Sequence, residues 1–300
     1  MKDVFIINSM ASKKAKYEWM KEIKEHFQGR RIIIEKTKEP GHATHIAKKY
    51  ALQKDEEIRM FVCGGDGTLH EVVNGIAGCK HIKMAIIPIG TGNDFIKTFH
   101  GLTKADFLNL ENYEDPIEMP CDLLKIDGEY ALNTISFGFD VHVAQYANAM
   151  NRKLPFHGII PYYLGMLKAL SKPLGDSYRL QMDEQIIPTH SYTFLVAANG
   201  CCYGGGYTPC PKADIQDGWM DVCLIGQAKR HEIVKMAKSY EKGELADLMP
   251  ERVHVQKAKV FHVDTQNQSI GANLDGEVKY FKNPTIEIIP QAIQLLIPKM

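Results

Sequence analysis

The sequence has no stretch of about 18 uninterrupted apolar residues, the length that a membrane-spanning helix needs. Its first residues contain an apolar run too short for a secretion signal. It also has no excess of either charge, because 36 basic and 36 acidic residues cancel. These absences argue against a transmembrane protein and against a domain whose whole surface binds nucleic acid. We therefore expect a cytoplasmic protein with no nucleic-acid partner.

Paired cysteine spacing is absent as well. The chain has seven cysteines, an odd number, and none of them forms a C-x-x-C pair. This pattern indicates reduced thiols and argues against both a disulfide framework and a zinc site. The cysteines are Cys63, Cys79, Cys121, Cys201, Cys202, Cys210 and Cys223.

Two common phosphate-binding motifs are missing. No Gly-Lys dipeptide occurs, so the G-x-x-x-x-G-K-[ST] loop of P-loop NTPases is absent. Gly65-Asp66-Gly67 and Gly90-Thr91-Gly92 both lack the third glycine of G-x-G-x-x-G. The sequence therefore excludes a P-loop NTPase and gives no dinucleotide-binding fingerprint.

The first part of the chain alternates apolar and amphipathic segments. Strands are expected at 3–8, 31–37, 58–64 and 82–90, with helical stretches ending near 27 and spanning 41–54 and 69–78. Several of these strands are apolar along their whole length, which is typical of a parallel sheet covered on both faces. The pattern predicts an α/β fold with an N-terminal doubly wound, nucleotide-sized domain.

The pattern changes near residue 115. Asp127-Gly128 indicates a hairpin turn. Helices are expected at 139–151, 157–171 and 229–242, and strands at 177–182, 190–198, 218–225, 258–264, 284–289 and 292–298. Short, closely spaced strands favour a mostly antiparallel β-sandwich. We predict two domains, 1–117 and 118–291. A last strand, 292–300, is expected to return to the first domain. The functional site is expected in the cleft between the two domains.

Two glycine-rich turns follow predicted strands. The first is Gly64-Gly65-Asp66-Gly67 and the second is Gly90-Thr91-Gly92. Parallel strands place both turns at the same carboxyl edge of the sheet, where α/β proteins bind ligands. Glycine permits close backbone approach, and a phosphate is the usual ligand at a strand-to-helix turn. Purely structural turns remain the alternative.

Several segments resemble the catalytic-domain family of diacylglycerol kinases, which includes bacterial lipid kinases and is related to sphingosine and ceramide kinases and, more distantly, to NAD kinases. The segments are GGDGTLHEVVNGI (64–76), IPIGTGNDF (87–95), CDLLKIDG (121–128), NGCCYGGGYTPCPKADIQDGWMDV (199–222) and NLDGE (273–277). The resemblance covers nearly the whole chain and implies that ATP, with Mg²⁺, is the phosphate donor.

The resemblance also implies positions for nucleotide binding. The residues that would hold the ATP phosphates are Gly64, Gly65, Asp66, Gly67, Thr68, Leu69 and His70. Further walls of the nucleotide site would come from Asn8, Ser9, Met10, Ala11, Ser12, Thr37 and Thr91. The chain departs from the family pattern at the first loop, which lacks the usual proline and glycine. It also has His70 where asparagine is common and Lys97 where arginine is common.

Catalytic and metal residues follow from the same resemblance. Glu277 matches the proposed catalytic base, Asp66 belongs to the nucleotide–metal network, and Asp122 links the catalytic centre to that network. A magnesium loop would involve Asp214, Asp217 and Trp219. The residue types suit phosphoryl transfer, which needs a phosphate cradle, charge neutralisation and a group that accepts the proton of the acceptor hydroxyl.

The implied acceptor is a lipid, so the protein should associate peripherally with a membrane. Arg152 and Lys153 precede a run rich in aromatic and aliphatic residues within 151–170, a composition that suits an interfacial helix, although a buried helix fits equally well. Two other functions stay open: an NAD kinase-like activity on a soluble dinucleotide, and a non-catalytic regulator that binds lipid or nucleotide. A homodimer is also left open.

Overall fold

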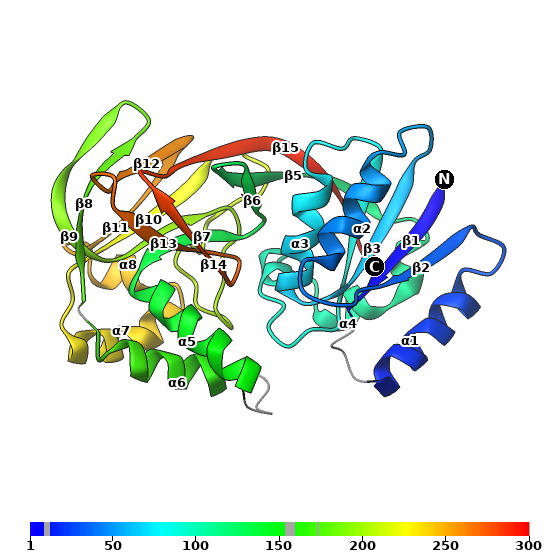
Figure 1. Cartoon of the computed structure of the whole chain (residues 1–300), viewed down its shortest axis with the longest axis horizontal. Helices are drawn as coiled ribbons and strands as arrows, with labels where there is room; N and C mark the ends of the chain where they lie inside the picture. Colours follow the sequence, from blue (N-terminus) through cyan, green and yellow to red (C-terminus); the bar gives the residue numbers. More distant parts are fainter. Residues whose placement is uncertain (9–12, 154–159, 173, 300) are drawn as a thin grey trace. The chain divides into compact units, whose positions relative to one another are not determined.

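A computed structural model describes residues 1–8, 13–153, 160–172 and 174–299, and for 13–18, 151–153 and 160–163 it describes the backbone alone. The chain forms two compact units (Figure 1). Unit 1 comprises Met1–Asp122 with Gln291–Met300, and unit 2 comprises Leu123–Pro290. Two long strands, β5 (Ile117–Ile126) and β15 (Thr285–Ile297), run through the boundaries between them.

Unit 1 is built on a parallel sheet. Its strands are β1 (Lys2–Ile7), β2 (Ile32–Lys36), β3 (Ile58–Gly64) and β4 (Ile82–Pro88), in the order β4-β3-β1-β2. The end of β15 adds a further parallel strand beside β4, with Gln294 opposite Lys83 and Leu296 opposite Ala85. The helices α1 (Lys13–His26), α2 (His42–Ala51) and α3 (Asp66–Ile76) connect the strands, as the alternating sequence pattern predicts.

The strands of unit 1 are buried on both faces, which explains their unbroken apolar sequences. Phe5 and Phe61 stack with ring centroids 4.4 Å apart, and Ile23 of α1 packs in the same cluster with Phe27, which directly follows the helix. Val4, which alternates with Phe5, is also completely buried. Burial of both faces requires helices on both sides of the sheet.

Three short helices in unit 1 were not predicted: η1 (Phe95–Thr98), α4 (Lys104–Leu108) and η2 (Leu110–Tyr113). Helix α4 begins with a capping box, in which the Thr103 hydroxyl accepts from the Asp106 N–H and the Asp106 carboxylate accepts from the Thr103 N–H. Segments this short contain too few residues to show a helical period.

Unit 2 is mainly antiparallel, which confirms the predicted sandwich-like second part. The hairpin of β5 and β6 (Glu129–Ala131) turns at Asp127-Gly128, where both residues have positive φ, as predicted. The other strands are β7 (Thr134–Gly138), β8 (Asp176–Met182), β9 (Gln185–Ala198), β10 (Met220–Gly226), β11 (Val253–Ala258), β12 (Val260–Asp264), β13 (Ser269–Leu274) and β14 (Glu277–Lys282).

The long strand β9 organises unit 2. It pairs with β8, β7 and β10, and its register shifts against both β8 and β10. One cluster of buried side chains, including Phe137, Leu195 and Phe261, fills the core enclosed by these strands. A second cluster lies between β9 and β10 and the helices α5 (Phe139–Lys153), α6 (Ile160–Ala169), α7 (Arg230–Glu241) and α8 (Leu245–Leu248).

The sequence pattern was wrong about several strands. It predicts separate strands at 284–289 and 292–298, but β15 is continuous across Pro290 and Gln291, where Gln291 has a positive φ of 50°. It also misses β11, β13 and β14. The last two form a hairpin of strands that are only partly buried, so their apolar alternation is weak.

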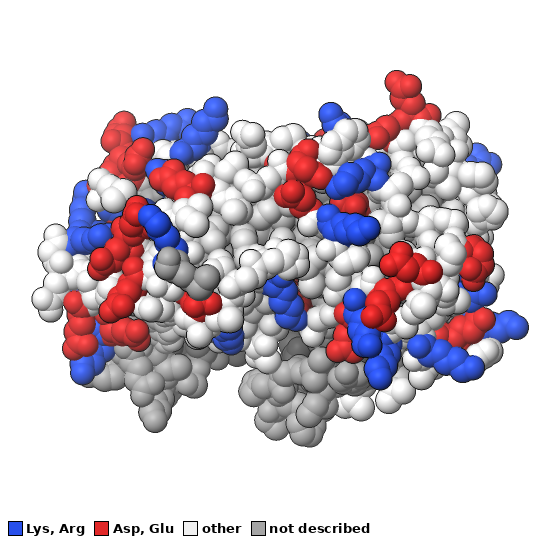
Figure 2. Space-filling view, turned by 180° about the vertical axis from the view of Figure 1, so that it is seen from behind, with Lys and Arg blue, Asp and Glu red and all other residues white. Residues whose placement is uncertain are grey.

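The surface carries both charges. Lysine and arginine side chains lie among aspartate and glutamate side chains over the face in Figure 2, consistent with the zero formal net charge. Among the described helices, none is both long and apolar enough to cross a membrane.

Candidate active site

The carboxyl edge of the unit 1 sheet collects the predicted nucleotide-binding residues. Asn8 follows β1, Thr37 follows β2 and Gly64 ends β3. The Asn8 amide Nδ2 donates to Thr68 Oγ1 at 2.8 Å, so it joins the end of β1 to the first turn of α3. Because neighbouring parallel strands end at this edge, residues far apart in sequence lie together there. Ser9, Met10, Ala11 and Ser12 lie outside the described residues.

The two glycine turns touch each other. The Gly90 N–H donates to the Gly64 carbonyl at 3.1 Å, and a Cβ on Gly90 would lie 2.3 Å from the Gly65 Cα atom. These glycines therefore allow contact between two backbones. Gly67 differs, because a Cβ added there would have no neighbour within 4 Å. Gly67 thus leaves space beside the N-terminus of α3, where backbone N–H groups and the helix dipole favour an anion.

Two carboxylates lie beside the second turn. A Cβ on Gly92 would be 2.9 Å from Asp66 Oδ2 and 3.9 Å from Asp94 Oδ2. Lys97 neutralises Asp94, with Nζ 2.7 Å from Oδ1. Lys97, at a position where arginine is common in the family, thus forms an ion pair with Asp94. Asp66 begins α3 and therefore lies where the two turns meet.

Other predicted nucleotide residues differ in exposure. The side chains of Thr68, Leu69 and His70 are buried, as is that of Thr37, whereas Thr91 is exposed. The Thr68 and Leu69 N–H groups both donate to the Gly65 carbonyl, at 2.9 and 3.1 Å, so neither is directed at a ligand.

In unit 2 the Asp275-Gly276 turn connects β13 and β14, and both residues have positive φ. The Asp275 carboxylate accepts backbone N–H groups from Leu132, Asn133 and Thr134 at 2.7–3.0 Å. Asp275 therefore fixes the turn, whereas Glu277, the first residue of β14, is exposed.

A hydrogen-bond chain joins this turn to a buried acid. Asn273 accepts from the Gly276 N–H at 3.0 Å and donates to Asp140 Oδ2 at 2.9 Å. Ser136 Oγ also donates to Asp140. Burial raises the pKa of the Asp140 carboxyl, and the hydrogen bonds it accepts, including those from Ser136 and Asn273, oppose that rise. Nothing in the sequence pattern had identified Asp140.

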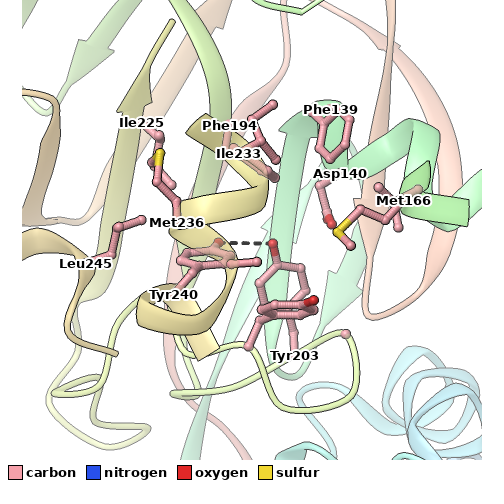
Figure 3. Close-up of a pocket in the computed structure, with 14 residues that line it drawn as sticks. Phe139, Asp140, Met166, Phe194, Tyr203, Ile225, Ile233, Met236, Tyr240 and Leu245 are labelled. Atoms are coloured by element: carbon pink, nitrogen blue, oxygen red, sulfur yellow. Dashed lines mark hydrogen bonds between the residues drawn. The ribbon is translucent and has the colours of Figure 1, made fainter. Parts of the chain in front are cut away.

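Asp140 lies at the edge of an apolar pocket in unit 2 (Figure 3). The cavity itself has a volume of about 60 Å³. Its polar groups are few: the Tyr203 and Tyr240 hydroxyls form a hydrogen bond of 3.1 Å, and burial raises the pKa of both tyrosines well above the usual value. The apolar lining comes mainly from Phe139, Val143, Met166, Phe194, Tyr207, Ile225, Ile233, Met236, Ala237 and Leu245.

Asp122 is fully buried, and its Oδ1 accepts the Gln291 N–H at 2.7 Å. This bond fixes the backbone at the left-handed residue where β15 enters unit 1. Asp122 therefore stabilises the backbone at Gln291, and its catalytic role stays a prediction.

The loop before β10 does not fit the magnesium site that the resemblance implies. Asp214 Oδ1 accepts the Gln216 N–H, and Asp217 Oδ1 accepts the Trp219 N–H. The other oxygen of Asp217 lies 2.6 Å from Lys257 Nζ. Across the described part of the chain, no cluster of three or more His, Cys, Asp or Glu side chains is arranged to hold a metal ion.

The structure thus combines a parallel sheet that carries two touching glycine turns with an antiparallel unit that carries an acidic hairpin turn. Residues 2–126 match the diacylglycerol kinase catalytic domain, and residues 133–297 match the YegS C-terminal NAD kinase beta sandwich-like domain. The chain belongs to the diacylglycerol kinase-like family that combines these two domains.

Relatives agree with this assignment. A Staphylococcus aureus (strain MRSA252) protein named "putative lipid kinase" is 29% identical over 83% of this chain and 79% of its own length. The crystal structure of a diacylglycerol kinase from Bacillus anthracis has a TM-score of 0.72 at 23% identity, covering 99% of this chain and 96% of that one. An Archaeoglobus fulgidus NAD kinase in complex with ATP has a TM-score of 0.52 at 10% identity, covering 99% and 94%. These two structures show the likeness of fold.

Proposed function

We propose that the protein is a lipid kinase that transfers the γ-phosphate of ATP to the hydroxyl group of a diacylglycerol-like lipid. The observation that carries the proposal is the apolar pocket of unit 2. Its aromatic, aliphatic and methionine side chains suit an aliphatic chain, whereas a soluble dinucleotide would need many more polar partners. Asn273 connects the polar edge of this pocket to the turn before Glu277. Membership of a kinase family supports ATP as the donor.

The reaction divides the chemistry between the two units. Mg²⁺-bound ATP is the phosphate donor, and the N–H groups around Gly65 and Gly67 bind its phosphates, with Asn8, Thr37 and Thr91 as further nucleotide contacts. Glu277 accepts the proton of the lipid hydroxyl. The oxygen of that hydroxyl then forms a bond to the γ-phosphorus, and the bond from the γ-phosphorus to ADP breaks. Asp66 would hold the Mg²⁺ ion, whose positive charge offsets that of the phosphates.

The direct test uses purified full-length protein with Mg²⁺ and radiolabelled ATP. The acceptors are diacylglycerol, monoacylglycerol, sphingosine and ceramide in mixed micelles, and NAD in solution. The proposal expects a labelled lipid and no labelled NADP. Labelling of NAD alone would establish the dinucleotide alternative, and binding of ATP and lipid without any labelled product would indicate a regulator.

The pocket can be tested by filling it. Ala237 lies on α7 and lines the pocket, so Ala237→Phe places a ring in the space that we assign to the acyl chain. We expect KM for a long-chain lipid to rise about tenfold or more, since one or two lost methylene contacts already cost about 1–2 kcal/mol. The affinity for ATP should stay unchanged.

The control adds the same bulk elsewhere. Ala149→Phe places a ring at an exposed position of α5 and should leave KM for the lipid unchanged. An Ala237→Phe protein that unfolds like the wild type and keeps its KM would show that the lipid chain binds outside this pocket.

We also propose that the α6–α7 face contacts the membrane. Leu164 and Leu167 of α6 and Val234 of α7 are 40%, 61% and 54% exposed. Both helices also line the pocket, and Arg230 of α7 donates to the Leu170 carbonyl at the end of α6. Exposed lysines at 168, 172, 235 and 238 lie on or beside these helices, and they suit an anionic lipid surface. The side chains of Arg152 and Lys153 lie outside the described part.

Substitution of Leu167 and Val234 by glutamate should therefore reduce sedimentation with anionic vesicles by roughly tenfold or more, because it removes two apolar contacts and adds repulsion. Ile186→Glu is the matched control, since Ile186 is 76% exposed but lies on β9. Equal vesicle binding by the double variant and the wild type would leave these side chains without a membrane role.

A further inference from the structure

The loop that leads into β10 is held by its own backbone and by two lysines. Gly218 has a φ of 73°, and Asp217 bonds to the Trp219 N–H two residues later at 2.9 Å, so the loop turns sharply before the strand begins. The Lys259 ammonium lies 4.7 Å from the centre of the Trp219 ring, within the range of a cation–π contact.

The second lysine, Lys257, is placed by strand pairing. It lies on β11 directly opposite Asp221 of β10 in the antiparallel ladder, so the two side chains start from the same face. Its Nζ atom lies 3.1 Å from Asp221 Oδ2 and 2.6 Å from Asp217 Oδ2. Asp221 is buried, with 8% of its side chain exposed. One ammonium group therefore joins the loop carboxylate to a buried strand carboxylate.

This arrangement leaves little for a divalent cation to bind. Mg²⁺ takes six oxygen ligands at about 2.0–2.1 Å in octahedral geometry. Both oxygens of Asp217 already accept hydrogen bonds, one from a backbone N–H and one from Lys257. Asp214 is turned toward its own loop, where it accepts the Gln216 N–H. A magnesium ion on Asp217 would also meet the repulsion of an ammonium within a few ångströms.

We infer that Lys257 replaces the divalent metal at this loop, supplying the positive charge that couples Asp217 to Asp221, so that the folded loop needs no Mg²⁺. The inference concerns the structural loop alone and is independent of the Mg²⁺ that accompanies ATP. Conversely, removal of the Lys257 charge exposes two neighbouring carboxylates, which then attract a divalent cation.

Thermal unfolding of the full-length protein without nucleotide tests this, in EDTA and in millimolar Mg²⁺. The wild type and Asp217→Asn should show the same response to Mg²⁺. Lys257→Met should unfold roughly 2–4 °C lower than the wild type in EDTA, and Mg²⁺ should recover part of the loss. The double variant Lys257→Met with Asp217→Asn should show no such recovery. Lys282→Met, which removes an exposed lysine of β14, is the matched control.

A spectroscopic measurement keeps the test decisive if Lys257→Met folds poorly. Tb³⁺ takes oxygen ligands, and its luminescence is sensitised by a nearby indole such as Trp219. Wild-type protein should give no emission that depends on Asp217, whereas Lys257→Gln should give emission that Asp217→Asn abolishes. A wild-type protein that Mg²⁺ stabilises, or that sensitises Tb³⁺, in an Asp217-dependent manner overturns the inference. Lysine variants without a response in either measurement also overturn it.

Discussion

Glu277→Gln should lower kcat for lipid phosphorylation by roughly 10²–10⁴-fold, the range typical for loss of a general base. The glutamine keeps the size and shape of the side chain but cannot accept the hydroxyl proton. Glu277 begins β14 on the exposed side of the turn, so the change should leave the fold intact. The measurement is the initial rate at saturating ATP, combined with calorimetric titration of ATP, whose affinity should change less than twofold.

Two further variants show whether the effect is specific. Glu287→Gln, at an exposed position of β15, should leave kcat unchanged. Asp275→Asn should act mainly on stability, because it sets an amide N–H₂ against backbone donors from Leu132, Asn133 and Thr134, at a cost of about 1–3 kcal/mol. If Glu277→Gln retains normal kcat, the proton acceptor lies elsewhere.

Strands, turns and helices could be predicted from the sequence where neighbouring residues alone determine the local structure. The buried run 58–64 followed by glycines predicts strand, turn and helix, because burial on both faces demands an apolar strand and the turn demands glycine. The Asp127-Gly128 turn could be predicted because an Asp-Gly pair favours the positive φ that a tight hairpin turn requires. Both residues have positive φ in the structure. Neither inference needs information from elsewhere in the chain.

Features that depend on distant residues could not be predicted. Gly90 must be glycine because its backbone contacts Gly65, which lies in the turn between β3 and α3. Asp140, Tyr203 and Tyr240 form one polar edge of the pocket although they lie on separate elements of the chain. Lys257 likewise could not be paired with Asp221 from the sequence, because the contact depends on the register between β10 and β11. A single lysine or aspartate belongs to no periodic pattern or motif, so its role can be assigned only when the fold shows which residue it contacts.

Asp66→Ala should reduce turnover by at least about 10²-fold, because it removes a fixed negative group at the point where the two phosphate turns meet. Two observations support so large an effect. The Asp66 carboxylate lies beside Gly92 of the second turn, and the neighbouring Asp94 is already paired with Lys97. Because Asp66 Oδ1 also accepts the Phe95 N–H at 3.4 Å, its carboxylate links the two turns, where we propose that it holds the Mg²⁺ of the ATP complex.

The stability cost of Asp66→Ala should be small. Its side chain begins α3, where a negative charge is worth about 0.3–1 kcal/mol through the helix dipole. Its Oδ1 also accepts the Phe95 N–H at 3.4 Å, and loss of that long hydrogen bond adds about 0.5–1.5 kcal/mol. The variant should thus keep a cooperative thermal transition within a few degrees of the wild type while losing phosphorylation of lipid. Asp55→Ala, at an exposed position in unit 1, is the control and should keep full activity. A folded Asp66→Ala protein with wild-type turnover would remove Asp66, and with it the assignment of this edge of the sheet, from the phosphoryl-transfer site.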